Sequence, residues 1–192
     1  MDIAAVRRLR LIATAAVSVS YWGLLCWQHL HGGVPGHSFM ARDDMPRISN
    51  WWGALLLPVL SYMLTGRMQA RLASAPAAGS DVTRTTRAML VAFTAALLYG
   101  AALAASFATG RSEISSLIFR ALPVIALLWP IYRAEYVFGF VLALTYTFGA
   151  VLPTVIATVI AVLSLVLRRV ILHGLRRLVR RRQRAVSESR AR

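Results

Sequence analysis

The chain has 192 residues, of which 58% are hydrophobic and 15% are charged, and its formal net charge at pH 7 is +15. Long tracts without any charge, at residues 88–107 and 137–151, exclude an ordinary soluble domain, in which charged residues are spread along the chain. All 22 basic residues are arginines, and they flank these tracts, where they face anionic lipid headgroups; we therefore expect membrane lipids as partners and no nucleic acid.

The first apolar tract covers residues 11–27 and follows the basic opening sequence MDIAAVRRLR. No small-residue cleavage site precedes its aromatic residues, so we interpret it as a retained membrane span rather than a signal peptide. It contains Cys26, the single cysteine of the chain, which excludes an intramolecular disulfide. A second span is predicted at residues 51–65, and the polar stretch 66–87 after it is interpreted as a solvent loop that includes a helical extension of this span.

A third span is predicted at residues 88–107 and a fourth at residues 117–131. Arg133 and Glu135 lie in the tight connection that follows, and we expect an ion pair between them to fix this turn. The apolar run 137–172 is about twice the roughly 20 residues that one helix needs, and it is interrupted at 149–153. It is therefore predicted to form a hairpin of two spans, whose small residues allow close helix packing.

The distribution of arginines predicts the orientation of these six spans. If the spans alternate, most arginine groups fall on one side: Arg7, Arg8, Arg10, Arg67, Arg71, Arg84, Arg87, Arg133 and the tail from Arg168 onward. The positive-inside rule assigns this side to the cytoplasm, whereas five spans would put the arginine-rich tail outside. We expect an all-α, polytopic transmembrane helical bundle of about six spans in a bacterial inner membrane, with both termini cytoplasmic.

The same pattern predicts one transmembrane domain at residues 1–172 and a basic cytoplasmic tail at residues 173–192. The tail spaces its Val, Ile and Leu residues among arginines, which is typical of a helix that lies along the cytoplasmic leaflet and binds anionic headgroups. A protein partner in the membrane is the alternative for this segment.

The segment at residues 29–53 lies on the periplasmic side in this topology and contains most of the histidines. His29, His31 and His37 offer imidazole nitrogens, and Asp43 or Asp44 offers a carboxylate, a set that suits a divalent metal. The spacing matches no known ligand pattern. The alternative is that the histidines lie at headgroup level and bond to backbone and lipid, without a metal.

Asp43 and Asp44 also suggest a second kind of chemistry. Mutual repulsion of two carboxylates raises one pKa, which provides an acid and a base for catalytic proton transfer. The neighbouring Arg42 and Arg47 favour a simpler interpretation, a solvated cluster of ion pairs at the membrane surface.

Residues at the start of the second span are candidates for a pocket. Ser49 or Asn50 is suited to cap the helix. Asn50, Trp51 and Trp52 would face the same periplasmic opening as the histidines and can shape a site for a polar headgroup or a ring. Glu113, in the link between the third and fourth spans, can complete this site or pair with Arg111.

The runs HGGVPGHSFMARDDMPRISNWWGALLLPVL and RAEYVFGFVLALTYTFGAVLP resemble a family of small bacterial multi-pass membrane proteins. The resemblance covers the first, second and fifth spans. It implies a membrane location, and no activity, substrate or cofactor comes with it.

Three classes of function are compatible with these features. The first is a membrane-embedded enzyme that acts on a lipid-soluble substrate at the periplasmic His/Asp segment. The second is an accessory or assembly subunit of a membrane complex, which needs no catalytic group. The third is a small transporter, which the scarcity of charged residues within the spans and the lack of a visible inverted repeat disfavour.

Overall fold

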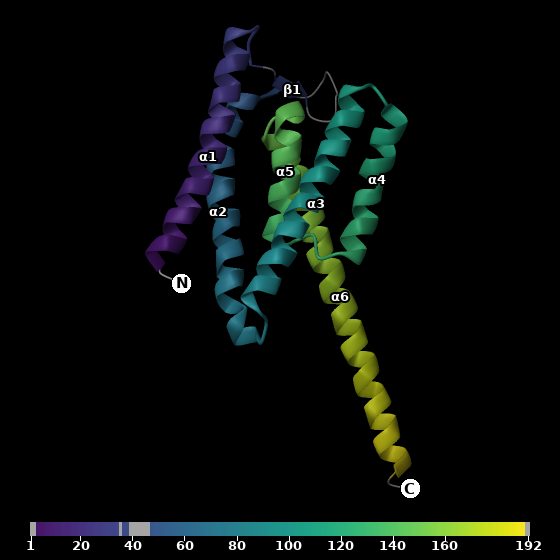
Figure 1. The fold of residues 1–192 in the computed structure, drawn as a ribbon. Coiled ribbons are helices and arrows are strands. Elements are labelled where there is room, and N and C mark those ends of the chain that lie inside the picture. The colour runs from purple at the N-terminus through teal and green to yellow at the C-terminus, as the bar shows by residue number, and fades with distance from the viewer. Residues whose placement is uncertain (1–2, 35, 39–46, 191–192) are drawn as a thin grey trace.

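The computed structural model describes residues 3–34, 36–38 and 47–190, with side chains described for residues 4–34 and 49–171. Six α-helices follow one another: α1 (Ile3–Leu30), α2 (Gly53–Ser74), α3 (Val82–Ala108), α4 (Ser112–Leu128), α5 (Ala134–Phe148) and α6 (Val151–Arg190). They run alternately up and down, and the N and C termini lie toward the same end of the bundle (Figure 1). The prediction of a helical bundle is confirmed for the described residues.

Three of these helices are long and apolar enough to cross a membrane: Ala4–Leu30, Val82–Ala108 and Val151–Ile171. Helix α5 is apolar but shorter. The second half of α2 carries Arg67, Gln69 and Arg71, which lower its hydropathy. Large apolar side chains are exposed along the long helices, for example Leu98 at 63% and Val159 at 60%. Such apolar surfaces are unusual on soluble monomers and fit a protein surrounded by lipid.

The helices extend beyond the predicted spans on the arginine-rich side. Helix α2 continues to Ser74, which confirms the helical extension expected there. Helix α3 begins at Val82, six residues before the apolar tract, because the Asp81 carboxylate caps it by accepting a hydrogen bond from the Thr83 N–H at 3.1 Å. The solvent loop is thereby reduced to a short turn that contains the 3₁₀ helix η3 (Pro76–Ala78).

Helix α5 occupies the centre of the bundle, where α2, α3 and α6 pack against it. Its closest partner is α3, because small residues let the two backbones approach. A Cβ atom added at Gly139 would collide with the carbonyl oxygen of Phe93, and one at Gly100 would lie 2.8 Å from the Cβ of Ala143. The small residues of the fifth and sixth spans were expected to allow close helix packing, and the structure shows such packing between α5 and α3.

A short β-hairpin connects α1 to α2. Strand β1 (Gly36–Ser38) pairs antiparallel with β2 (Arg47–Ser49), with His37 opposite Ile48. The 3₁₀ helix η2 (Asn50–Trp52) follows, and the Ser49 hydroxyl accepts a hydrogen bond from the Trp51 N–H at 3.3 Å. Ser49 is therefore the capping residue, one of the two candidates predicted.

The basic tail continues α6 as one unbroken helix to Arg190. In Figure 1 this helix extends well beyond the other five, along the direction that α6 already has within the bundle. A helical tail was expected, and its contact with anionic headgroups stays a prediction.

Candidate functional site

A cavity of about 350 Å³ lies between α3, α4, α5 and α6. Such a volume falls within the range of small-molecule sites in proteins. Its walls are formed almost entirely by aliphatic and aromatic side chains, among them Val91, Ala95, Leu122, Ile125, Phe140 and Ile160. Val91 and Trp129, which also line it, are 63% and 57% exposed, so the cavity opens to the outside beside them.

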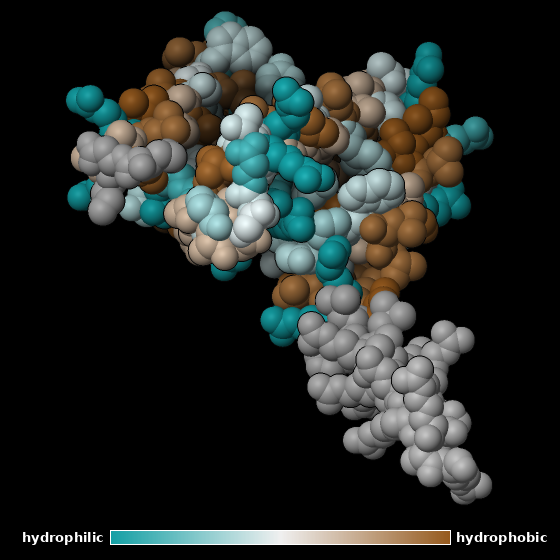
Figure 2. Space-filling model, turned by 60° about the horizontal axis from the view of Figure 1, so that its bottom comes forward, coloured by the Kyte–Doolittle hydropathy of each residue, from teal (hydrophilic) through white to brown (hydrophobic). Residues whose placement is uncertain are grey.

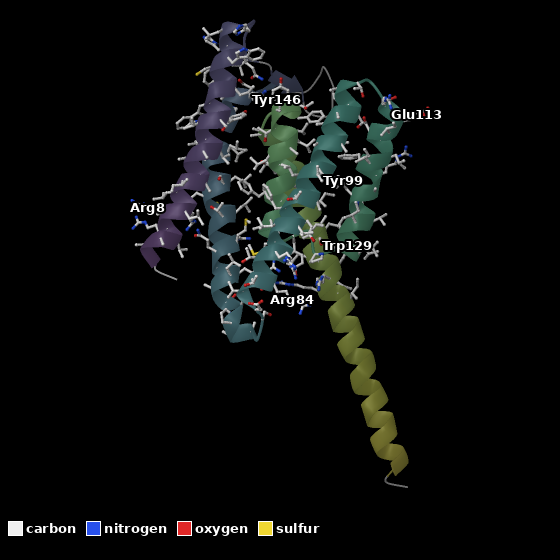
Figure 3. All side chains as sticks on the ribbon, in the orientation of Figure 1. Arg8, Arg84, Tyr99, Glu113, Trp129 and Tyr146 are labelled. Carbon is white, nitrogen blue, oxygen red and sulfur yellow. The ribbon has the colours of Figure 1, made fainter. Side chains whose placement is uncertain are left out.

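Two hydroxyl groups beside this cavity bond to the backbone. The Tyr99 hydroxyl of α3 donates a hydrogen bond to the Ile118 carbonyl of α4. The Ser164 hydroxyl of α6 donates to the Trp129 carbonyl at 3.1 Å. Figure 3 shows Tyr99 and Trp129 one above the other on this side of the bundle. Because these groups are already bonded, the cavity presents hydrocarbon surface and suits an apolar chain better than a charged molecule.

Arginines surround the end of the bundle toward which this cavity extends. Figure 2, which brings that end forward, shows hydrophilic residues gathered at its centre and hydrophobic residues on its flanks. On α3, Arg87 lies one helical turn before the lining residue Val91, and Arg133 lies between the lining residues Ile131 and Tyr136. The mouth of an apolar cavity is thus close to positive charge.

One arginine at this end is paired with a buried carboxylate. Arg71 of α2 donates a hydrogen bond to Glu135 of α5, whose side chain is 1% exposed. The predicted ion pair between Arg133 and Glu135 is therefore wrong. Glu135 belongs to the first turn of α5, where the helix dipole favours a carboxylate, and it points toward α2 rather than back into the turn.

His29 and His31 lie at the opposite end, where α1 ends, and they pack against different aromatic rings. The His31 ring stacks on Trp27 with a centroid distance of 4.8 Å, and its Nδ1 is 2.9 Å from the Trp27 carbonyl oxygen. The His29 ring meets Trp51 edge-on at 6.1 Å. An Nδ1–H bonded to a carbonyl would leave Nε2 of His31 as its only metal-binding nitrogen.

The remaining residues of the predicted metal and acid–base sites lie outside the described side chains. His37 is placed only by its backbone in β1, and Asp43 and Asp44 fall outside the described residues altogether. Among the residues that the structure does describe, no group of three or more His, Cys, Asp or Glu side chains could hold a metal ion. The metal centre and the catalytic aspartates stay predictions.

The predicted pocket residues are dispersed. Asn50 is buried, with its amide oxygen against Gly149, while its carbonyl accepts a hydrogen bond from the Tyr21 hydroxyl at 3.0 Å. Trp51 and Trp52 are 51% and 67% exposed. Glu113 begins α4, which lies at the opposite edge of the bundle from α1 (Figures 1 and 3). The structure brings Trp51 to His29, and it brings neither Asn50 nor Glu113 to the histidines.

Comparisons with known proteins identified no relative of this chain. No family model, no curated protein and no solved structure matches this chain. The resemblance of residues 31–60 and 133–153 to a family of small bacterial membrane proteins therefore stays a prediction.

Sequence reasoning missed both the cavity and the buried carboxylate. The cavity has one visible signal in the sequence, a stripe of small residues on α3 that includes Ala92, Ala95 and Ala96 and leaves space opposite α4. For Glu135 the signal was its position at the start of a helix that otherwise has no charged residue.

Proposed function

We propose that this chain is a six-span protein of a bacterial inner membrane, with both termini in the cytoplasm, that binds the hydrocarbon part of a lipid-soluble ligand between α3, α4, α5 and α6. The observation that carries the proposal is the cavity of about 350 Å³ with its apolar walls. A membrane protein meets hydrocarbon chains at high concentration, and an apolar cavity that opens on its side can take one up from the bilayer.

The alternation of the helices supports six spans. Helices α4 and α5 have 17 and 15 residues and so are only about 25 and 22 Å long, less than the roughly 30 Å hydrocarbon core. Helix α5 packs against α2, α3 and α6, so protein rather than lipid covers most of its surface. A short helix in such a position leaves few backbone groups facing lipid, which removes the main objection to its length.

The arginines support the orientation. Both termini and the turns α2–α3 and α4–α5 lie at one end of the bundle (Figure 1), and the arginines of α1, α2, α3 and α6 gather there. At the other end the described side chains include only Arg111 and Arg120. The positive-inside rule then puts the first end in the cytoplasm.

The positions of the cavity and the histidines favour ligand binding in the cavity over catalysis by His29 and His31. The cavity is formed by α3 to α6 and extends toward the arginine-rich end, whereas His29 and His31 lie at the end of α1 on the other side of the bundle. A chain held in the cavity would not reach them. An enzymatic reaction at the His/Asp segment is thus a separate prediction, with its own test.

A phospholipid with a photoreactive diazirine near the end of one acyl chain tests the binding proposal. We expect saturable labelling of cavity residues, competed by unlabelled lipid, in full-length protein in nanodiscs. Ala95→Phe fills part of the cavity and should reduce this labelling, whereas Ala102→Phe, at an exposed α3 position away from the cavity, should not. Labelling spread evenly over the exposed helices and unchanged by Ala95→Phe would contradict the proposal.

A further inference from the structure

Arginines on α3, before α5 and on α6 follow the lining residues of the cavity toward the arginine-rich end of the bundle, the one on α6 about two turns beyond the lining residue Ile160. Arg87 of α3 is four residues, or about 6 Å along the helix, from Val91. Arg133 precedes the first turn of α5, between two lining residues. Arg168 of α6 lies one turn beyond Ser164, whose hydroxyl bonds to the Trp129 carbonyl at the cavity mouth.

Within the described side chains, these three arginines have no acidic partner. Arg87 and Arg168 are exposed and Arg133 is half-buried. In the part of the chain with described side chains, the one ion pair is that between Arg71 and Glu135, so none of the described carboxylates neutralises the three guanidinium groups. Figure 3 shows a further arginine, Arg84, lower in the view than Trp129 and near the start of α3, which adds positive charge to this end of the bundle.

An apolar cavity next to unpaired arginines is complementary to an anionic amphiphile, whose hydrocarbon part would occupy the cavity and whose charged group would bind the arginines. A guanidinium group binds phosphate oxygens through two parallel hydrogen bonds, and it does so best where water is partly excluded. The proposed topology puts these arginines at the level of the cytoplasmic headgroups and the cavity at the level of the acyl chains.

We propose that the cavity holds an acyl chain of an anionic glycerophospholipid of the cytoplasmic leaflet, whose phosphate is bound by Arg87, Arg133 and Arg168. This inference rests on the proposed function and adds the chemical class of the ligand. The hydrocarbon walls disfavour free inorganic phosphate as the occupant, because phosphate would leave the cavity empty. The three arginines disfavour a neutral lipid, because their charges would then stay unpaired beside a desolvated chain.

Native mass spectrometry of the full-length protein, released from nanodiscs with equal amounts of phosphatidylglycerol and phosphatidylcholine, measures the preference directly. We expect one tightly retained phosphatidylglycerol per chain. Changing Arg87, Arg133 and Arg168 singly to Gln should weaken its retention about tenfold each, the effect of losing one charge-assisted hydrogen bond. The triple variant should retain the two lipids equally.

A matched control separates this site from general attraction of anionic lipid. Changing Arg7, Arg8 and Arg67 together to Gln removes the same charge from exposed positions on α1 and α2, away from the cavity (Arg8 in Figure 3), and should leave the preference intact. Circular dichroism melting of each variant checks that the bundle is folded. Free phosphate at millimolar concentration should not displace the retained lipid.

The outcomes distinguish the two proposals. If Ala95→Phe abolishes lipid retention while the arginine triple variant still prefers phosphatidylglycerol, the cavity binds a chain and the assignment of the phosphate site is overturned. If the Arg87/Arg133/Arg168 and Arg7/Arg8/Arg67 triple variants lower the preference for phosphatidylglycerol equally, the attraction is nonspecific and the assignment of the phosphate site is overturned as well. If Ala95→Phe changes nothing, the proposed function itself falls.

Discussion

Arg71 and Glu135 are separated by 64 residues in the chain and meet at the arginine-rich end of the bundle, where they join α2 to α5. Helices α1 and α2 pack together as one pair, and α3 to α6 form the group that encloses the cavity. The ion pair therefore links two parts of the bundle that share few other polar contacts in the described residues.

The two partners of this pair should not be equally important for stability. Arg71→Gln leaves a carboxylate that is 1% exposed without its cation and should lower the free energy of unfolding by about 3–5 kcal/mol. Glu135→Gln leaves Arg71, which is 32% exposed and can be hydrated, and should cost about 1 kcal/mol. Thermal melting in detergent, followed by circular dichroism, gives the order of the two variants.

Arg67→Gln is the control for this prediction, because Arg67 is exposed on the same helix, one turn before Arg71, and takes no part in the ion pair. It should melt within error of the parent protein. Equal melting of the Arg71 and Glu135 variants would show that the pair is solvated and contributes little.

The turn between α5 and α6 should tolerate no side chain at Gly149. Its φ of 70° and ψ of 176° are accessible essentially only to glycine, and a Cβ there would collide with the amide oxygen of Asn50. Gly149→Ala should destabilise the protein by about 3 kcal/mol or more, the strain and the collision together. The loss of folded protein after heating, measured by size-exclusion chromatography, checks this.

Gly110 provides the comparison for the Gly149 variant. Its φ of 67° is also left-handed, but a Cβ at this position would meet nothing within 4 Å. Gly110→Ala should therefore cost only the backbone strain, about 1 kcal/mol. Equal losses at the two glycines would mean that Asn50 moves aside without cost.

Reporter fusions test the proposed topology. Alkaline phosphatase should be active when inserted at Gly110 and inactive when inserted at Gly79 or fused after Arg192, and green fluorescent protein should show the reverse. A bundle in which only the three long apolar helices cross would put the two termini on opposite sides of the membrane. An active phosphatase at the C terminus, with a fluorescent N-terminal fusion, would support that arrangement instead.

The metal prediction has a direct measurement. If His29, His31 and His37 bind a divalent metal, elemental analysis of the purified protein should find about one equivalent, and the variant with all three changed to Ala should contain none. His31→Ala alone should remove most of it, because a site with three imidazole ligands would lose one of them, the Nε2 of His31. The absence of metal from a folded parent protein, after growth with zinc, copper and iron, would leave His29 and His31 as aromatic contacts of Trp51 and Trp27.

The sequence predicted the helices well wherever hydropathy alone defines them. The apolar tracts gave all six helices and the break near Gly149, because the need to exclude polar groups from hydrocarbon shapes the composition directly. The prediction from hydropathy missed the first turns of α3, because Asp81 caps a helix that begins in polar sequence. Helix length beyond the apolar tract depends on capping and on solvent-side charges, which hydropathy does not capture.

Contacts between distant helices were beyond prediction. Arg133 was chosen as the partner of Glu135 because it is close in sequence, whereas the real partner depends on how α2 packs against α5. The cavity likewise depends on four helices together, and its alanine stripe on α3 has meaning only once the facing helix is known. The histidine segment was conspicuous in sequence, yet its two described histidines pack on different rings.

The separation of Arg71 from Glu135 also sets an order of events during biosynthesis. At roughly 5–20 residues per second, the ribosome adds the intervening 64 residues in about 3–13 s. During that interval α2 is already complete and its arginine has no carboxylate to meet. Helices α1 and α2 are therefore synthesised before their carboxylate partner exists, and the arrival of α5 both fills the centre of the bundle and links these two helices to those that follow.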